Sequence, residues 1–204
     1  MNQIVVVCFL NGGHLYSCFM RTFIAIEIPE ETRQGLRDAQ RVLRTDAVDA
    51  SWPKPEGIHL TLKFLGEIPE TQIPEITNAL TAAAAGTVRF RLAVRGTGTF
   101  PNARNARVVW AGMSGEIDKL KRLQAAVEDA MTQAGFAREN RPFTPHLTLG
   151  RIKYIRSREA WARTLDQVKN LTLPEFDVSS FSMIKSELKR TGAEYTQIAK
   201  FELK

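Results

Sequence analysis

Stretches with helical spacing and stretches with strand spacing follow one another along the chain, and this order predicts an α+β fold. Apolar residues recur every three or four positions in residues 30–43, 69–85, 117–134 and 158–168, as in amphipathic helices. Alternating or β-rich stretches at residues 23–28, 58–65, 88–99, 107–113 and 146–152 predict strands, and residues 176–185 and 195–203 predict a last antiparallel pair. Short strands joined by hairpins favour antiparallel sheets with helices on their outer faces.

Two of the predicted strands begin in the same way. Residues 52–57 and 140–145 each contain two prolines and must be irregular, and each leads directly into the tetrapeptide His-Leu-Thr-Leu, at residues 59–62 and 146–149. The two copies use two of the three histidines in the chain. We interpret this as an internal repeat, with two halves of one folding unit related by pseudo-twofold symmetry.

Strand alternation separates the repeated motif into a polar and an apolar face. Side chains of a strand point alternately to its two sides, so each histidine shares a face with the threonine two residues later. The expected polar positions are His59, Thr61 and Lys63 in the first copy and His146 and Thr148 in the second. The expected core positions are Leu60, Leu62 and Phe64, and Leu147 and Leu149. Facing halves would bring the two His–Thr pairs together across a central cleft.

Two such histidines suffice for general acid–base catalysis. Imidazole titrates near pH 6.5, at about neutrality, so one ring can accept a proton while the other donates one. In-line displacement at phosphorus places the entering and leaving oxygens on opposite sides, which suits groups on facing strands. A zinc site needs at least three protein ligands, and neither motif has a cysteine or a third histidine near it. We therefore expect no metal and no cofactor.

The residues around both motifs resemble a known family. His59-Leu60-Thr61-Leu62-Lys63-Phe64-Leu65-Gly66 and His146-Leu147-Thr148-Leu149-Gly150-Arg151 are similar to the two His-x-Thr-x signatures of the 2H phosphoesterases, in particular bacterial RNA 2′,3′-cyclic phosphodiesterases, also described as 2′-5′ RNA ligases. The likeness extends to residues 21–29, Trp52, and residues 98–102, 108–112 and 143–145. It covers the chain from about Met20 to the C-terminus.

The resemblance implies two pseudo-symmetric lobes of antiparallel sheet, a cleft carrying both motifs, and metal-independent hydrolysis of a terminal RNA 2′,3′-cyclic phosphate to a 2′-phosphomonoester. It implies that His59 is the proton donor and His146 the proton acceptor. The implied phosphate-binding residues are Thr61, Thr148 and Arg151. Strict alternation would aim Arg151 away from His146, so its role requires a bulge or twist after Gly150.

Other side chains and other functions stay open at this level. Lys63 is expected to be a solvated edge charge, and core packing is favoured over base stacking for Trp52, Trp110 and Phe143. Arg104 and Arg107 are equally compatible with phosphate steering and with ordinary surface. The same site would serve 2′-5′ ligation or a small-nucleotide cyclic phosphodiesterase. A catalytically silent nucleotide- or RNA-binding module is the non-enzymatic alternative.

Composition adds the cellular setting. A formal charge of +6 and a pI near 9.5 give a mild preference for anionic partners such as RNA. Two cysteines in 204 residues fit a reducing cytoplasm, and the apolar run at residues 4–10 is too short to span a bilayer. Residues 1–19 are expected to be an N-terminal extension before a natural start at Met20, followed by one two-lobed domain at residues 20–204. We expect a monomer without membrane attachment.

Overall fold

The computed structural model describes residues 19–190 and 192–204. The predicted extension therefore lies outside the described residues, apart from Phe19, which is the first residue of strand β1. The architecture is α+β, as the alternation of patterns predicts.

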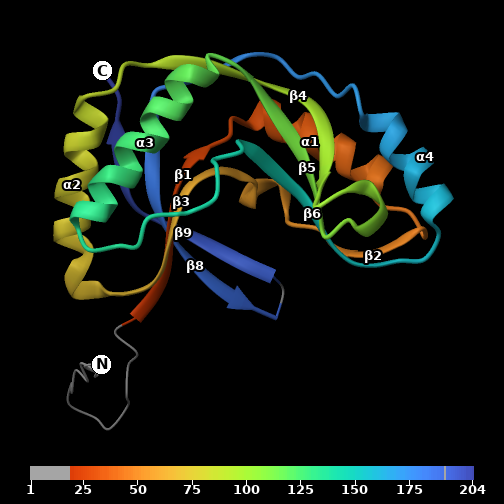
Figure 1. Cartoon of the computed structure of the whole chain (residues 1–204), viewed down its shortest axis with the longest axis horizontal. Coiled ribbons are helices and arrows are strands. Elements are labelled where there is room, and N and C mark those ends of the chain that lie inside the picture. The colour runs from red at the N-terminus through yellow and green to blue at the C-terminus, as the bar shows by residue number, and fades with distance from the viewer. Residues whose placement is uncertain (1–18, 191) are drawn as a thin grey trace, which may run out of the picture.

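The strands form two antiparallel sheets (Figure 1). The first sheet has the order β3 (His59–Pro69), β1 (Phe19–Glu27), β8 (Ser180–Lys189) and β9 (Gly192–Glu202). The second has the order β2 (Val48–Ser51), β6 (His146–Ile155), β5 (Val108–Gly115), β4 (Phe90–Phe100) and β7 (Phe176–Val178). Each sheet contains one of the two histidine motifs, at the start of β3 and of β6, and these two strands contact each other.

The described helices are α1 (Glu30–Leu43), α2 (Ile73–Ala85), α3 (Ile117–Gln133) and α4 (Arg158–Val168). Two of them, α1 and α3, pack against the sheet opposite to that of the strand they follow. Helix α1 follows β1 of the first sheet but packs against β6 of the second, whereas α3 follows β5 of the second sheet but packs against β3 of the first (Figure 1). Along its strands the chain passes between the two sheets four times, from β1 to β2, from β2 to β3, from β3 to β4 and from β7 to β8. None of the described helices is long and apolar enough to cross a membrane.

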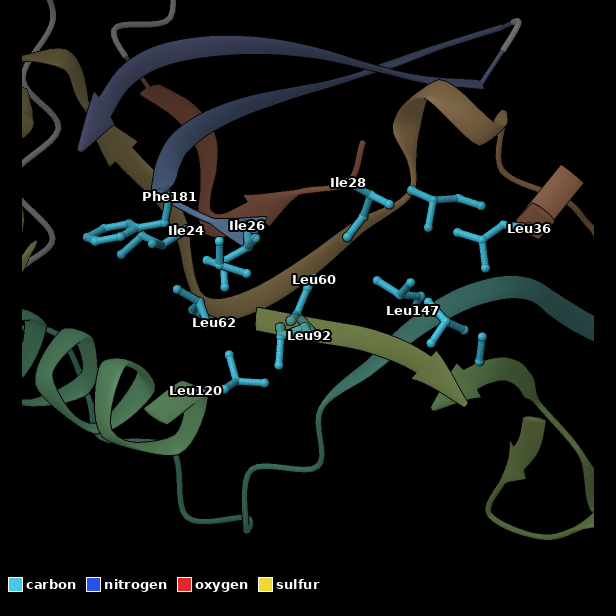
Figure 2. Packing of buried hydrophobic residues seen from close by; sticks show 14 of the residues in the cluster. Ile24, Ile26, Ile28, Leu36, Leu60, Leu62, Leu92, Leu120, Leu147 and Phe181 are labelled. Carbon is cyan, nitrogen blue, oxygen red and sulfur yellow. The ribbon is translucent and has the colours of Figure 1, made fainter. Parts of the chain in front are cut away.

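A single apolar cluster joins the two sheets. The predicted inward leucines of both motifs, Leu60 and Leu62 on β3 and Leu147 and Leu149 on β6, are buried in it. Figure 2 shows Leu36 of α1 on the side of Leu147, and Leu120 of α3 on the side of Leu62. Because burial of apolar area is the main stabilising contribution to folding, separating the sheets would expose both motifs' core faces together.

Several local predictions differ from the structure. The helix predicted over residues 69–85 begins only at Ile73, because β3 continues to Pro69 and residues 70–72 form a short 3-10 turn. Residues 176–185 are not one strand: Phe176–Val178 pairs with Phe90–Leu92 in the second sheet, and β8 begins at Ser180 in the first. The short strand β2 was not predicted at all. Local β-propensity is continuous across the break near Ser179, because it reports extended backbone and not the strand's partner.

Candidate active site

The two histidines are held in the same way. His59 Nδ1 lies 2.8 Å from the carbonyl oxygen of Gly57, and His146 Nδ1 lies 2.7 Å from that of Thr144. A carbonyl can only accept, so each Nδ1 carries a proton and donates it. In the neutral ring, Nε2 is then the unprotonated nitrogen. The irregular, proline-containing segments before the strands supply both carbonyls, which explains why the loop belongs to the repeat.

Each motif contains a β-bulge at the same position. In the pairing of β1 with β3, Ile24 and Ala25 are opposite Lys63 and Thr61, so Leu62 is the extra residue. In the pairing of β5 with β6, the register skips Leu149. A bulge turns the following side chains to the other face of the strand. The residues after it are Lys63-Phe64 in the first motif and Gly150-Arg151 in the second.

The first bulge overturns the predicted faces beyond Thr61. Lys63 is not a solvated edge charge: its side chain is only 4 % exposed and pairs with Glu128 at 2.6 Å. Phe64 is not a core residue but is 61 % exposed on the histidine's side of β3. The extra residue at Leu62 shifts the alternation by one position, which strict period-two reading cannot anticipate.

The second bulge places Arg151 on the face of β6 that its expected role requires. Gly150 is buried, and a Cβ there would lie 2.6 Å from the ring of Trp52. The tryptophan ring can therefore pack this closely on the bulge only because residue 150 is a glycine. Arg151 is exposed and lies on the same side of β6 as His146 and Thr148. Arg151 lies close enough to His59, on the other motif strand, for its positive charge to lower the pKa of that histidine.

His59 lies in an aromatic environment. Its ring stacks on Phe23 of β1 with centroids 4.4 Å apart, and Tyr195 of β9 meets it edge-on at 5.2 Å. Burial among these groups lowers the pKa of His59 from 6.5 to about 4. The hydrogen bond to the Gly57 carbonyl opposes this shift, and the charge of Arg151 adds to it. At neutral pH, His59 of the ligand-free protein is therefore an uncharged imidazole.

His146 has aromatic neighbours of a different kind. Phe100 meets its ring edge-on at 5.1 Å, and the ring of Trp110 lies 6.4 Å away. Trp110 stands opposite Thr148 in the strand pairing. Gly98 provides the space for this tryptophan, because a Cβ at that position would lie 2.3 Å from its ring. The family-like segments 98–102 and 108–112 thus form the wall beside His146.

The structure brings the five sequence-predicted site residues to two adjoining strands. Thr61 and Thr148 are half-buried on the faces of their histidines. Trp52 and Phe143 pack against the core, as favoured, whereas Trp110 is not in that cluster and lies beside His146. Arg104 and Arg107 are exposed, and Arg107 donates to the carbonyl of Lys153 at 3.2 Å. Within the two described ranges, no three His, Cys, Asp or Glu side chains converge as metal ligands would.

Three ring neighbours of the histidines were missed from the sequence alone. Phe23 and Phe100 lie within segments that carry the family likeness, so that likeness was a usable signal. No such signal pointed to Tyr195. Strand β9 is at the edge of the sheet opposite β3, and Tyr195 reaches His59 because β9 contacts residues 55–57 of the loop before the first motif.

Comparison with known proteins decides the family. The model of the LigT-like phosphoesterases matches residues 26–110 and 112–195, one histidine motif in each matched segment. The chain belongs to this family. A relative named RNA 2′,3′-cyclic phosphodiesterase, from Methanothermobacter thermautotrophicus, is 33% identical over 184 residues, which cover 90% of this chain and 99% of the relative.

Solved structures of the LigT-like family share the fold. TT0787 of Thermus thermophilus superposes with a TM-score of 0.76 at 33% identity, covering 90% of this chain and 98% of that one. E. coli LigT in complex with 3′-AMP superposes with a TM-score of 0.73 at 25% identity, covering 91% and 98%. The fold is that of the LigT-like phosphoesterases.

Proposed function

We propose that this protein hydrolyses the terminal 2′,3′-cyclic phosphate of RNA to a 2′-phosphomonoester by acid–base catalysis with two histidines. The observation that carries the proposal is the matched pair of imidazoles, each fixed through Nδ1 to the carbonyl two residues earlier, on contacting strands. The name of the M. thermautotrophicus relative, which the chain matches over nearly its whole length, supports the substrate class.

In the proposed reaction, His146 accepts a proton from water as the water oxygen bonds to phosphorus. The bond between phosphorus and the 3′-oxygen breaks, and His59 gives a proton to that oxygen. The products are a free 3′-hydroxyl and a phosphate on the 2′-oxygen. General acid–base groups contribute about 10²–10⁴-fold each, which suits a strained ring that contains its own leaving group.

The charge state of His59 links the reaction to binding. Its pKa of about 4 leaves the ligand-free ring uncharged at neutral pH. A bound phosphodiester places negative charge beside the ring, and an opposite charge favours the protonated form. The substrate therefore raises the pKa of His59 and recruits the proton that the leaving oxygen receives. Arg151, whose charge disfavours that proton in the ligand-free protein, is neutralised by the same phosphate.

The remaining groups bind the substrate. The hydroxyls of Thr61 and Thr148 donate to non-bridging phosphate oxygens, and Arg151 supplies a fixed positive charge. The exposed ring of Phe64 lies on the same face as His59 and offers a flat surface on which a base of single-stranded RNA stacks. The protein acts as a monomer, without a metal, in the cytoplasm. Residues 20–204 form the active domain.

The test is incubation of purified protein with a short RNA ending in a 2′,3′-cyclic phosphate, with and without a chelator. We expect conversion to the 2′-phosphomonoester at equal rates in both. A 3′-phosphomonoester product, or loss of turnover with the chelator, contradicts the mechanism. No turnover of the cyclic phosphate contradicts the proposed function itself.

A further inference from the structure

Two buried polar contacts connect the halves of the active site in a crossed pattern. The first runs from helix α1, where Gln40 is 1 % exposed. Its amide nitrogen donates to the carbonyl of Leu149 at 2.8 Å and to that of Pro53 at 3.0 Å. Leu149 is the bulge residue of the second motif, and Pro53 belongs to the loop before the first. One side chain therefore joins the His146 strand to the His59 loop.

The second contact runs from helix α3. Glu128 is 5 % exposed and accepts from Lys63 Nζ at 2.6 Å and from the backbone N–H of Glu139 at 2.9 Å. Lys63 Nζ also donates to the carbonyl of Ala137 at 2.9 Å. Lys63 directly follows the bulge of the first motif, and residues 137–139 open the segment that ends at the Thr144 carbonyl. This pair joins the His59 strand to the His146 loop.

The two contacts are counterparts within the repeat. Helices α1 and α3 are the two that pack against the opposite sheet, and each bears its buried polar residue in its C-terminal half. Buried polar groups are costly unless they are hydrogen-bonded. The Gln40 nitrogen and the Lys63–Glu128 pair are hydrogen-bonded, whereas Gln40 Oε1 has no partner among the described residues. Neither contact is part of a helix or sheet ladder. Their common property is that each ends at one bulge and at the loop preceding the other histidine.

We propose that Gln40 and the Lys63–Glu128 pair are positioning residues that hold each histidine loop against the bulge of the other motif and so fix the two imidazoles relative to each other. The proposal rests on the proposed function, since it concerns the same site. It assigns Lys63 a role away from the phosphate, although it lies two residues after Thr61. Reaction rates depend steeply on such geometry, and a misplacement of about 1 Å costs about 100-fold.

The first test replaces Gln40 by methionine, which keeps the length of the side chain and removes both donations. We expect kcat for the cyclic-phosphate RNA to fall about 10- to 100-fold while KM changes less than about 3-fold. Thr164→Val is the matched control, because it removes a buried hydroxyl whose bond, to the Ala160 carbonyl, stays within α4. Equal kcat losses in the two variants, measured at the same interval below each melting temperature, would overturn the proposal.

The second test is the double variant Lys63→Met with Glu128→Leu. Replacing both partners of a buried pair by apolar residues is often neutral for stability, so this protein is expected to fold. The readout is the ¹⁵N NMR signal of each imidazole in the absence of RNA. We expect the His146 ring, whose loop loses its anchor, to change its shift and tautomer balance more than His59 does.

The direction of that change separates a crossed contact from a local one. Lys63 lies on the strand of His59, so a local role would disturb His59 and leave His146 as it is, which would refute the proposal. Unchanged rings in both the double variant and Gln40→Met would also refute it. The NMR measurement needs no substrate, so it tests the positioning role independently of the proposed activity. The proposed activity is tested separately, by the assay of wild-type protein with cyclic-phosphate RNA.

Discussion

The two histidine motifs share a backbone design and differ in what surrounds it. Both have the same tetrapeptide, the same contact from Nδ1 to a carbonyl and the same bulge. After the bulge they diverge: the first motif buries a lysine and exposes Phe64, whereas the second buries Gly150 and exposes Arg151. His59 is desolvated by aromatic rings, and the charge of Arg151, from the other motif, lowers its pKa further. The repeat thus builds the geometry, and the residues beside it differentiate the two imidazoles.

The largest expected effect is the loss of either imidazole. His59→Ala and His146→Ala should each lower kcat/KM for a cyclic-phosphate RNA by about 10²–10⁴-fold, because each removes one proton-transfer group. The measurement is initial rate against RNA concentration, with circular dichroism to verify folding. Full activity in the variant that combines His59→Ala with His146→Ala would show that the matched pair is not the catalytic site.

A substrate with a good leaving group should separate the two roles. In bis(p-nitrophenyl) phosphate the departing phenolate needs little protonation, so the proton donor matters less than the acceptor. We expect His59→Ala to lose about 10-fold less activity on this ester than on RNA, and His146→Ala to lose similar activity on both. The opposite pattern would exchange the assigned roles while leaving the site in place.

The stability of the protein should also depend on pH through His59. Between pH 6.5 and about 4, the unfolded chain carries a proton on residue 59 that the folded protein does not. The free energy of unfolding therefore falls as pH drops through this window, by about 3 kcal/mol for this residue. Urea unfolding of wild type and His59→Gln at pH 7 and pH 4 measures it. A constant difference between the two proteins would show that His59 is not desolvated.

A smaller effect should follow removal of the charge beyond the second bulge. Arg151→Met is expected to raise KM about 10-fold through the lost phosphate contact, with a smaller change in kcat. The pKa of His59, measured by NMR titration, should rise but remain below its usual value, because burial is the main cause of its shift. Arg107→Met is the control, since that arginine is exposed on the β4–β5 hairpin. Equal effects in both variants would indicate only a general loss of positive charge.

Local sequence patterns predicted much of the candidate site and of the elements that carry it. Helical periodicity predicted α1 and α4 to the residue and α3 to within one residue. Proline-containing loops followed by His-Leu-Thr-Leu located both strands of the candidate site. The inward leucines followed from alternation alone, since the alternation is disturbed only after the bulge residues Leu62 and Leu149. These features depend on neighbours a few residues apart, and a local pattern records them completely.

The sequence by itself therefore determined the repeat and the α+β class, and it singled out the two histidines and their threonines as the candidate site. Only the tertiary structure decided the rest: the buried place of Lys63, the exposure of Phe64, the direction of Arg151, and the approach of Tyr195 to His59. Each of these depends on a strand register or on a partner far away in the chain. Register is set by pairing and packing between segments, and one extra residue in a strand reverses every side chain beyond it.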